Sequence, residues 1–195
     1  MVDRASALLR RGLALEYATL AWNVVGIVVL AVAAIAARSV ALAGFGLDSL
    51  IEIFASVVVV WELKGARSEA QERRALRLVA GAFVALAVYL ATQAVYVLAA
   101  AAKPHTSPLG IAWTAMTCAV MLGLARGKAL TGKALDNPVL QTEGKVTLVD
   151  AYLAGAVLAG LVVRAAFGWW WADPLAGFVI VFYAVKEARV AWAGE

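Results

Sequence analysis

Charged side chains are scarce in this chain. Only 15% of its 195 residues are Asp, Glu, Lys or Arg, whereas 64% are hydrophobic. A soluble domain of this length needs far more polar surface to face water. The scarcity of charge therefore argues against a water-soluble domain and indicates a chain that lies in a membrane.

Cysteine and histidine are each limited to one residue. A single cysteine, Cys118, cannot form an internal disulfide and argues against a thiolate metal cluster, so we interpret it as a small apolar helix residue. The one histidine, His105, follows Pro104 in a short predicted loop. We expect it to be solvated, because no neighbouring residue supports a cation contact there.

Long apolar runs fill most of the chain. Each has about 20 residues, enough for a helix to cross a hydrocarbon core of about 30 Å. The alternation of barrel strands is absent, and a helix satisfies its own backbone hydrogen bonds in lipid. We therefore predict an all-α polytopic membrane protein: one transmembrane domain over 1–195, without a soluble domain, whose six helices form a bundle. The predicted spans are 14–36, 40–63, 76–101, 108–126, 142–166 and 174–192.

The first apolar run is too long for the core of a signal peptide and leads into further spans, so we interpret it as a retained helix.

The distribution of basic residues predicts the orientation in the membrane. All but three of the 17 Lys and Arg residues fall on one predicted side, which makes both termini cytoplasmic and places the protein in the cell membrane. The basic residues flank apolar spans, so the net charge of +4 reflects membrane topology and does not indicate nucleic-acid binding. The predicted 4–5 loop contributes Arg126, Lys128 and Lys133, and the three exceptions are Arg38, Lys103 and Arg164.

The connection between the fifth and sixth spans carries aromatic residues. Three consecutive tryptophans, Trp169, Trp170 and Trp171, are typical of an anchor at the membrane interface. Asp173 and Pro174 follow, which suit the N-cap and the first position of a helix.

Carboxylates occur deep inside two of the predicted spans. Asp48 and Glu52 are four residues apart and share one helix face, roughly 12 to 18 Å below the surface at 1.5 Å per residue. Asp150 lies roughly 12 Å along the fifth span, which runs the opposite way. Charged groups at such depth are costly, and when present they usually mark an ion pathway.

The fifth span offers further ligands on the stripe of Asp150. Glu143, Thr147 and Asp150 have the i, i+4, i+7 spacing of one helix face. Three convergent carboxylates repel one another unless a cation or protons neutralise them. We therefore predict a metal site formed by Asp48, Glu52 and Asp150, with Glu143 and Thr147 as additional ligands.

Alternatives remain for the individual residues. The deep acids could be held neutral in a structural role, whereas salt bridges to buried bases are not expected, since no Lys or Arg is predicted at that depth. Glu143 and Lys145 are either ordinary interfacial charges or a gate. Glu16 and Asn23 in the first span either line the ion path or form interhelical hydrogen bonds.

Several stretches together resemble the cation diffusion facilitator family, the zinc and divalent-metal efflux antiporters. The stretch Ser39-Val40-Ala41-Leu42 followed by Asp48-Ser49-Leu50-Ile51-Glu52 looks like the family's second helix. Residues 143–150 look like its fifth helix, and 169–177 resemble the junction into its sixth. The match covers all six spans in order.

The resemblance implies a six-helix transporter, usually a homodimer, that exchanges a divalent cation for protons by alternating access. In zinc-exporting members the site takes two acids from the second helix and a His and an Asp from the fifth. Asp48, Glu52 and Asp150 match the acidic positions, but the histidine position falls on Val146, which cannot bind a metal. The family's cytoplasmic domain has no counterpart, and the segment 127–135 is similar to that of a shorter branch without it.

We therefore expect a proton-coupled exporter of a divalent metal. The resemblance favours zinc as the metal. Manganese, iron and cobalt are alternatives, because an all-oxygen site suits harder cations and imidazole favours zinc. No bond is made or broken, so we do not expect an enzyme. The expected partners are divalent cations, protons, the lipid bilayer and a second copy of the chain, and not nucleic acid. Two other functions stay open: a non-transporting metal-binding sensor or subunit of a larger assembly, and a proton-coupled carrier of an organic cation.

Overall fold

The computed structural model describes residues 2–37, 39–65, 69–100, 105 and 107–169, with short pieces at 181–182, 185–186, 188–189 and 192. Over these residues the predicted all-α membrane fold is confirmed, and five helices are long and apolar enough to cross a membrane. They are α1 (Val2–Ala37), α2 (Val40–Lys64), α3 (Glu69–Ala100), α4 (Pro108–Leu135) and α5 (Pro138–Phe167).

The predicted sixth span, 174–192, falls largely outside the described residues, and the pieces described within it are helical. A sixth span therefore stays a prediction. Some residues named in the sequence analysis also lie outside the described part: Arg38, Lys103, Pro104, Trp170, Trp171, Asp173 and Pro174.

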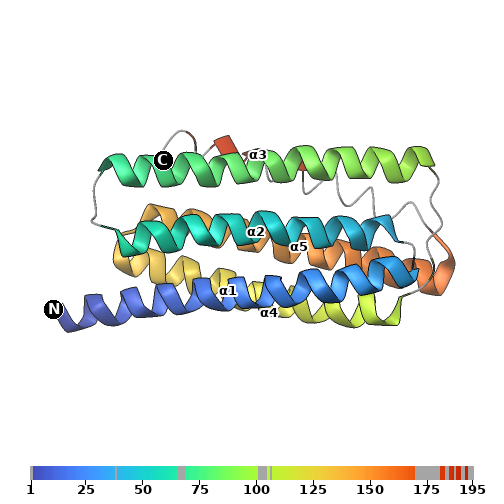
Figure 1. Cartoon of the computed structure of the whole chain (residues 1–195), viewed down its shortest axis with the longest axis horizontal. Helices are drawn as coiled ribbons and strands as arrows, with labels where there is room; N and C mark the ends of the chain where they lie inside the picture. The colour runs from blue at the N-terminus through green and yellow to red at the C-terminus, as the bar shows by residue number, and fades with distance from the viewer. Residues whose placement is uncertain are drawn as a thin grey trace.

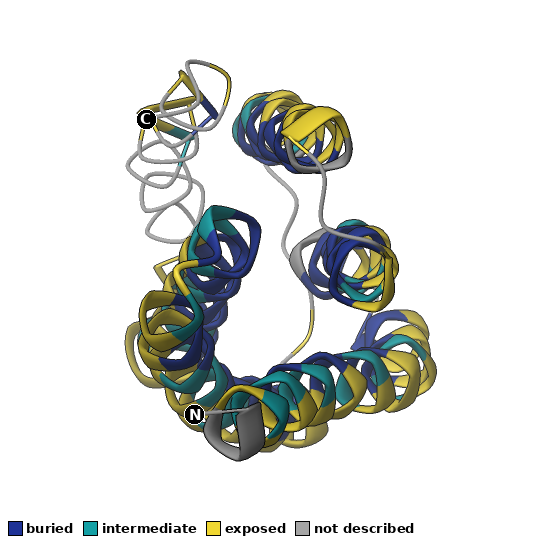
Figure 2. Ribbon diagram, turned by 90° about the vertical axis from the view of Figure 1, so that its left-hand side faces the viewer, coloured by how far each residue is buried: buried dark blue, intermediate teal, exposed yellow. Residues whose placement is uncertain are grey.

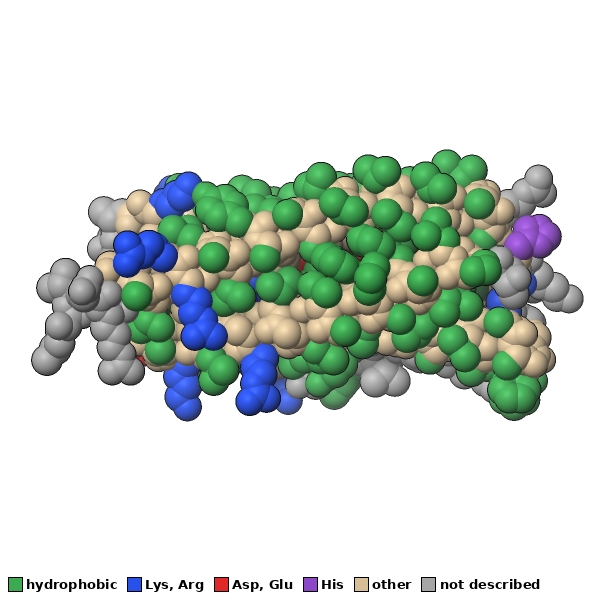
Figure 3. Space-filling view, turned by 90° about the horizontal axis from the view of Figure 1, so that it is seen from below, with side chains coloured by type: hydrophobic (Ala, Val, Ile, Leu, Met, Phe, Trp, Pro, Cys, Tyr) green, Lys and Arg blue, Asp and Glu red, His purple; other side chains and the backbone are tan. Residues whose placement is uncertain are grey.

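The five helices run alternately up and down along the long axis (Figure 1). The starts of α1 and α3, the end of α2 and the α4–α5 turn lie at the same end of the bundle, on the left in Figure 1. Lys and Arg side chains gather toward that end on the face drawn in Figure 3, and the histidine lies at the other. The two ends thus differ in charge as the sequence suggests, while the orientation in the membrane stays a prediction.

Apolar side chains cover much of the outside of the bundle, and polar side chains occupy part of its inside. Ile35, Val28 and Val88 are 79%, 63% and 61% exposed, whereas Glu16, Lys128 and Glu143 are fully buried. Buried faces of the helices turn toward one another in Figure 2, with exposed residues on the outer faces. This is the reverse of a water-soluble protein and suits a chain surrounded by lipid.

Helix α4 is longer than predicted, and this is the main correction to the fold. We expected it to end near residue 126 in a basic loop, but it continues to Leu135. The turn comes only at Asp136, which adopts a left-handed conformation (φ 50°), and at Asn137, whose side chain caps α5 by accepting a hydrogen bond from the backbone N–H of Leu140. Charge alone did not end the helix, so Lys128 lies within it and is not a loop residue.

Glycines let α4 and α5 pack with their backbones close together. A Cβ atom on Gly132 would stand 2.8 Å from the backbone nitrogen of Gln141, and one on Gly144 would stand 3.0 Å from that of Ala129. Small residues at such contacts are typical of helix packing in membranes. The close approach brings Lys128 of α4 against α5.

Candidate functional site

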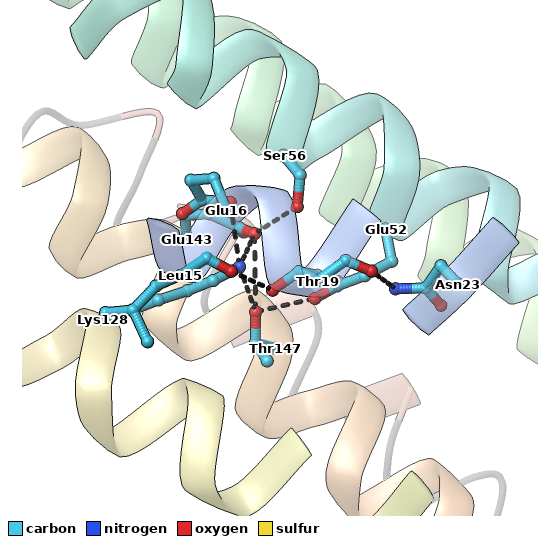
Figure 4. Close-up of polar contacts among 9 residues, drawn as sticks. All are labelled: Leu15, Glu16, Thr19, Asn23, Glu52, Ser56, Lys128, Glu143 and Thr147. Carbon is cyan, nitrogen blue, oxygen red and sulfur yellow. Dashed lines mark hydrogen bonds and ion pairs between the residues drawn. The ribbon is translucent and has the colours of Figure 1, made fainter. Parts of the chain in front are cut away.

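Four helices contribute buried polar side chains to the inside of the bundle. We call these residues the polar cluster: Glu16 of α1; Asp48, Glu52 and Ser56 of α2; Lys128 of α4; and Glu143, Thr147 and Asp150 of α5. None is more than 3% exposed. Figure 4 shows most of them, with the side chains of Lys128, Glu143 and Thr147 converging between the helices.

Lys128 is the centre of one part of the cluster, which we call the lysine-bound group. Its ammonium nitrogen lies 3.0 Å from Oε2 of Glu16, forms an ion pair with Oε1 of Glu143, and donates a hydrogen bond of 2.9 Å to Oγ1 of Thr147. Ser56 donates a further hydrogen bond of 3.2 Å to Oε1 of Glu143. All these side chains are buried, so the fold itself supplies the counter-ion for Glu16 and Glu143.

This geometry contradicts one expectation and narrows another. We expected no base near the buried acids, and Lys128 is such a base. Glu143 is also not an exposed surface charge, because its side chain is fully buried, whereas Lys145 two residues later is exposed. Glu16 does form an interhelical contact, as one of its alternatives held, and its partner is Lys128.

Thr147 joins the lysine-bound group to Glu52. An ammonium group can only donate, so Oγ1 of Thr147 accepts from Lys128. The hydroxyl proton of Thr147 is then directed to Oε1 of Glu52, at 2.6 Å. The carboxylate of Glu52 is therefore held in place from α5 by a residue that Lys128 itself orients.

Asp48 and Asp150 form a second part of the cluster, the aspartate pair. Their carboxyl groups interact with each other across α2 and α5. Oδ2 of each aspartate is buried without a hydrogen-bond partner in the described part of the chain. The ion pairs of the polar cluster described here are those of Lys128, and neither aspartate takes part in them.

The structure brings all five predicted metal-site residues into one cluster but not into one closed cage. Glu143 and Thr147 belong to the lysine-bound group, Asp48 and Asp150 form the aspartate pair, and Glu52 lies near enough to interact electrostatically with both aspartates. Within the described ranges, no group of three or more His, Cys, Asp or Glu side chains is placed to hold a metal ion. A metal bound by Asp48, Glu52 and Asp150 thus requires Glu52 to turn toward the pair.

The other candidates have plainer roles in the described structure. Asn23 donates from its side chain to the carbonyl of Thr19 in its own helix, at 3.1 Å. His105 is exposed, and its backbone N–H donates to the carbonyl of Ala37 at the end of α1. Val146 is buried in the apolar core, and Trp169 is about half exposed.

Sequence reasoning missed Lys128, although a signal was present. The buried residues of α4 recur every three or four positions, from Trp113 through Thr117, Met121 and Ala125 to Lys128. No proline interrupts this pattern before Pro138. The periodicity therefore places Lys128 on the same inward face as the apolar residues before it.

Tyr89 of α3 was also missed. Its buried hydroxyl group has no hydrogen-bond partner among the described residues, and it is an electrostatic neighbour of Asp48. A single tyrosine in an apolar span carries no pattern that marks it in advance.

The comparison with known families identifies a membrane-protein family. Residues 17–191 match the model of the cation efflux transmembrane domain. The matched range begins one residue after Glu16 and includes every other member of the polar cluster.

Proposed function

Because this chain belongs to the cation efflux transmembrane domain family, and is thus a membrane transporter of cations, we propose that it exports a divalent metal in exchange for protons. The observation that carries this proposal is the aspartate pair. Asp48 and Asp150 are buried together and form no ion pair with a base among the described residues, which supports balance of their charge by a cation from outside the protein. A proton and a metal cation are the two candidates for that balance.

We assign the metal to Asp48, Asp150 and Glu52, with Glu143 and Thr147 outside its immediate ligands. The unpartnered Oδ2 atoms of the two aspartates are the available acceptors, and Glu52 is the next carboxylate. Carboxylates bind metal only when deprotonated, so metal loading releases protons and protonation releases the metal. This competition is the chemical basis of the proposed antiport, in which the helices rock to open the site to each side in turn.

The proposed metal is zinc, with manganese, iron and cobalt as alternatives. All the proposed ligands are oxygens, which suit harder cations, and Val146 supplies no imidazole. Zinc also accepts carboxylates, and water can complete its tetrahedron. We further propose that the protein works as a homodimer in the cytoplasmic membrane with both termini inside.

Transport can be tested in metal-free proteoliposomes loaded with a fluorescent metal indicator. A pH gradient is imposed, and Zn²⁺, Mn²⁺, Co²⁺ or Fe²⁺ is added outside. We expect uptake of at least one ion that stops when the gradient is collapsed. Binding of these ions without uptake would contradict transport and favour a metal-binding sensor or subunit.

The choice of metal can be tested at position 146. The Val146→His variant adds an imidazole one helical turn before Asp150, the proposed ligand of α5, and we expect its preference to shift toward Zn²⁺ over Mn²⁺. An unchanged preference would place position 146 away from the metal.

A further inference from the structure

The surroundings of the Lys128 ammonium group are those of a bound cation. Two carboxylates and one hydroxyl oxygen, from three residues on two other helices, contact it: Glu16, Glu143 and Thr147. Each of the four side chains is fully buried. Oxygen ligands of this kind are also those that hard divalent cations take from proteins.

The lysine-bound group contains more carboxyl groups than bases. One ammonium group faces two carboxylates, and the contact with Glu16 is an ion pair that is not aligned as a hydrogen bond. Both oxygens of Glu16 and Oε2 of Glu143 are buried without hydrogen-bond partners among the described residues. These unpartnered carboxyl oxygens are available as ligands for a cation in place of the ammonium group.

Helix α4, which carries Lys128, packs closely against α5. Gly132, one turn beyond Lys128, and Gly144, next to Glu143, let the backbones of α4 and α5 come close together. Lys128 therefore reaches Glu143 and Thr147 across a contact that leaves little room for either helix to shift. The ammonium group stays at this position because its helix does.

We propose that the ammonium group of Lys128 permanently occupies a second cation-binding position, formed by Glu16, Glu143 and Thr147, and so excludes divalent metal from it. The position is a latent metal site in which the protein's own lysine replaces the ion. Metal binding is thereby limited to Asp48, Glu52 and Asp150. This restriction rests on the proposed function, in which these three residues bind the transported metal.

The test counts metal ions bound to the purified full chain by equilibrium dialysis against Zn²⁺ and, separately, Mn²⁺. The Lys128→Met variant removes the charge and keeps most of the side-chain length. We expect it to bind one more divalent ion per chain than the wild type. Adding Glu143→Gln to Lys128→Met should abolish the additional ion, because one of the two carboxylates is lost.

Two further variants serve as controls. Lys133→Met makes the same change at an exposed position of α4, five residues away, and should leave the ion count unchanged. Lys128→Arg keeps the positive charge at the position itself and should also bind no additional ion.

Two results would overturn the inference. One is a folded Lys128→Met variant that binds no more ions than the wild type. The other is an additional ion that persists after Glu143→Gln.

If Lys128→Met does not fold without metal, its thermal unfolding is followed with and without Zn²⁺ or Mn²⁺. Folding that returns with the ion supports a latent site. Folding that returns only with Glu143→Gln, and never with an ion, contradicts it and leaves a structural pair. A wild type that binds no divalent ion would contradict the proposed function, and the gain in Lys128→Met could still be measured.

Discussion

The lysine-bound group and the aspartate pair are two solutions to the same electrostatic problem. Both bury two acids between α5 and other helices, and Glu143 and Asp150 lie on one stripe of α5, about 10 Å apart along its axis. In the first group Lys128 supplies the compensating charge, whereas neither aspartate forms an ion pair with a base among the described residues. This difference indicates that an external cation is needed at Asp48 and Asp150, which form no ion pair with a base among the described residues.

The largest expected effect on stability comes from removing the base. Lys128→Met leaves Glu16 and Glu143 buried without a counter-ion, and we expect it to lower the free energy of unfolding by about 3–5 kcal/mol in the presence of a chelator. Chemical unfolding in detergent measures this. Lys133→Met should stay near the wild type, and an equal loss in both variants would show that the buried contacts of Lys128 do not stabilise the fold.

A smaller effect is expected at the link between the two groups. Thr147→Val keeps the shape of the side chain but loses the hydrogen bonds to Lys128 and Glu52, and it should cost about 1.5–3 kcal/mol because both partners are charged groups. Thr147→Ser should retain most of the stability. The matched control is Thr92→Val, because the hydroxyl of this exposed threonine bonds only a carbonyl of its own helix among the contacts described. If Thr147→Val is no less stable than Thr92→Val, Thr147 does not join the groups.

The smallest of the three effects concerns the contact that positions Lys128. A Cβ on Gly132 meets the backbone of α5, so Gly132→Ala should cost about 1–3 kcal/mol through overpacking. Gly123 lies on the same helix with nothing within 4 Å of the added carbon, and Gly123→Ala should be neutral or stabilise by up to about 1 kcal/mol. Thermal unfolding compares the two, and an equal response would mean that α4 and α5 can separate at little cost.

The parts of the fold that depend on one helix at a time were predictable. Long apolar runs predicted six spans, of which five appear as helices among the described residues, and spacing within α2 and α5 placed Asp48 with Glu52 and Glu143 with Thr147 on shared faces. The end of α4 was wrong because basic residues were interpreted as a loop. The signals that end it are the left-handed turn at Asp136 and the cap at Asn137.

The pairing of acids with partners could not be predicted, because it depends on contacts between helices. Spacing along α5 treats Glu143 and Asp150 alike, as two acids on one stripe. Only the approach of α4 at Gly144 gives Glu143 a lysine, and only the packing of α2 gives Asp150 an aspartate. The difference in function between the two acids thus arises from tertiary packing.

The most direct test of the central claim compares metal uptake by Asp150→Asn and Asp136→Asn in proteoliposomes. Both variants replace one aspartate with its neutral isostere, and the exposed, left-handed position 136 accepts asparagine well. We expect Asp150→Asn to lower the uptake rate by at least about tenfold, since losing a metal ligand should cost no less than losing a supporting residue. Asp136→Asn should transport like the wild type. Equal uptake by the two variants would contradict the assignment of the aspartate pair as the cation site.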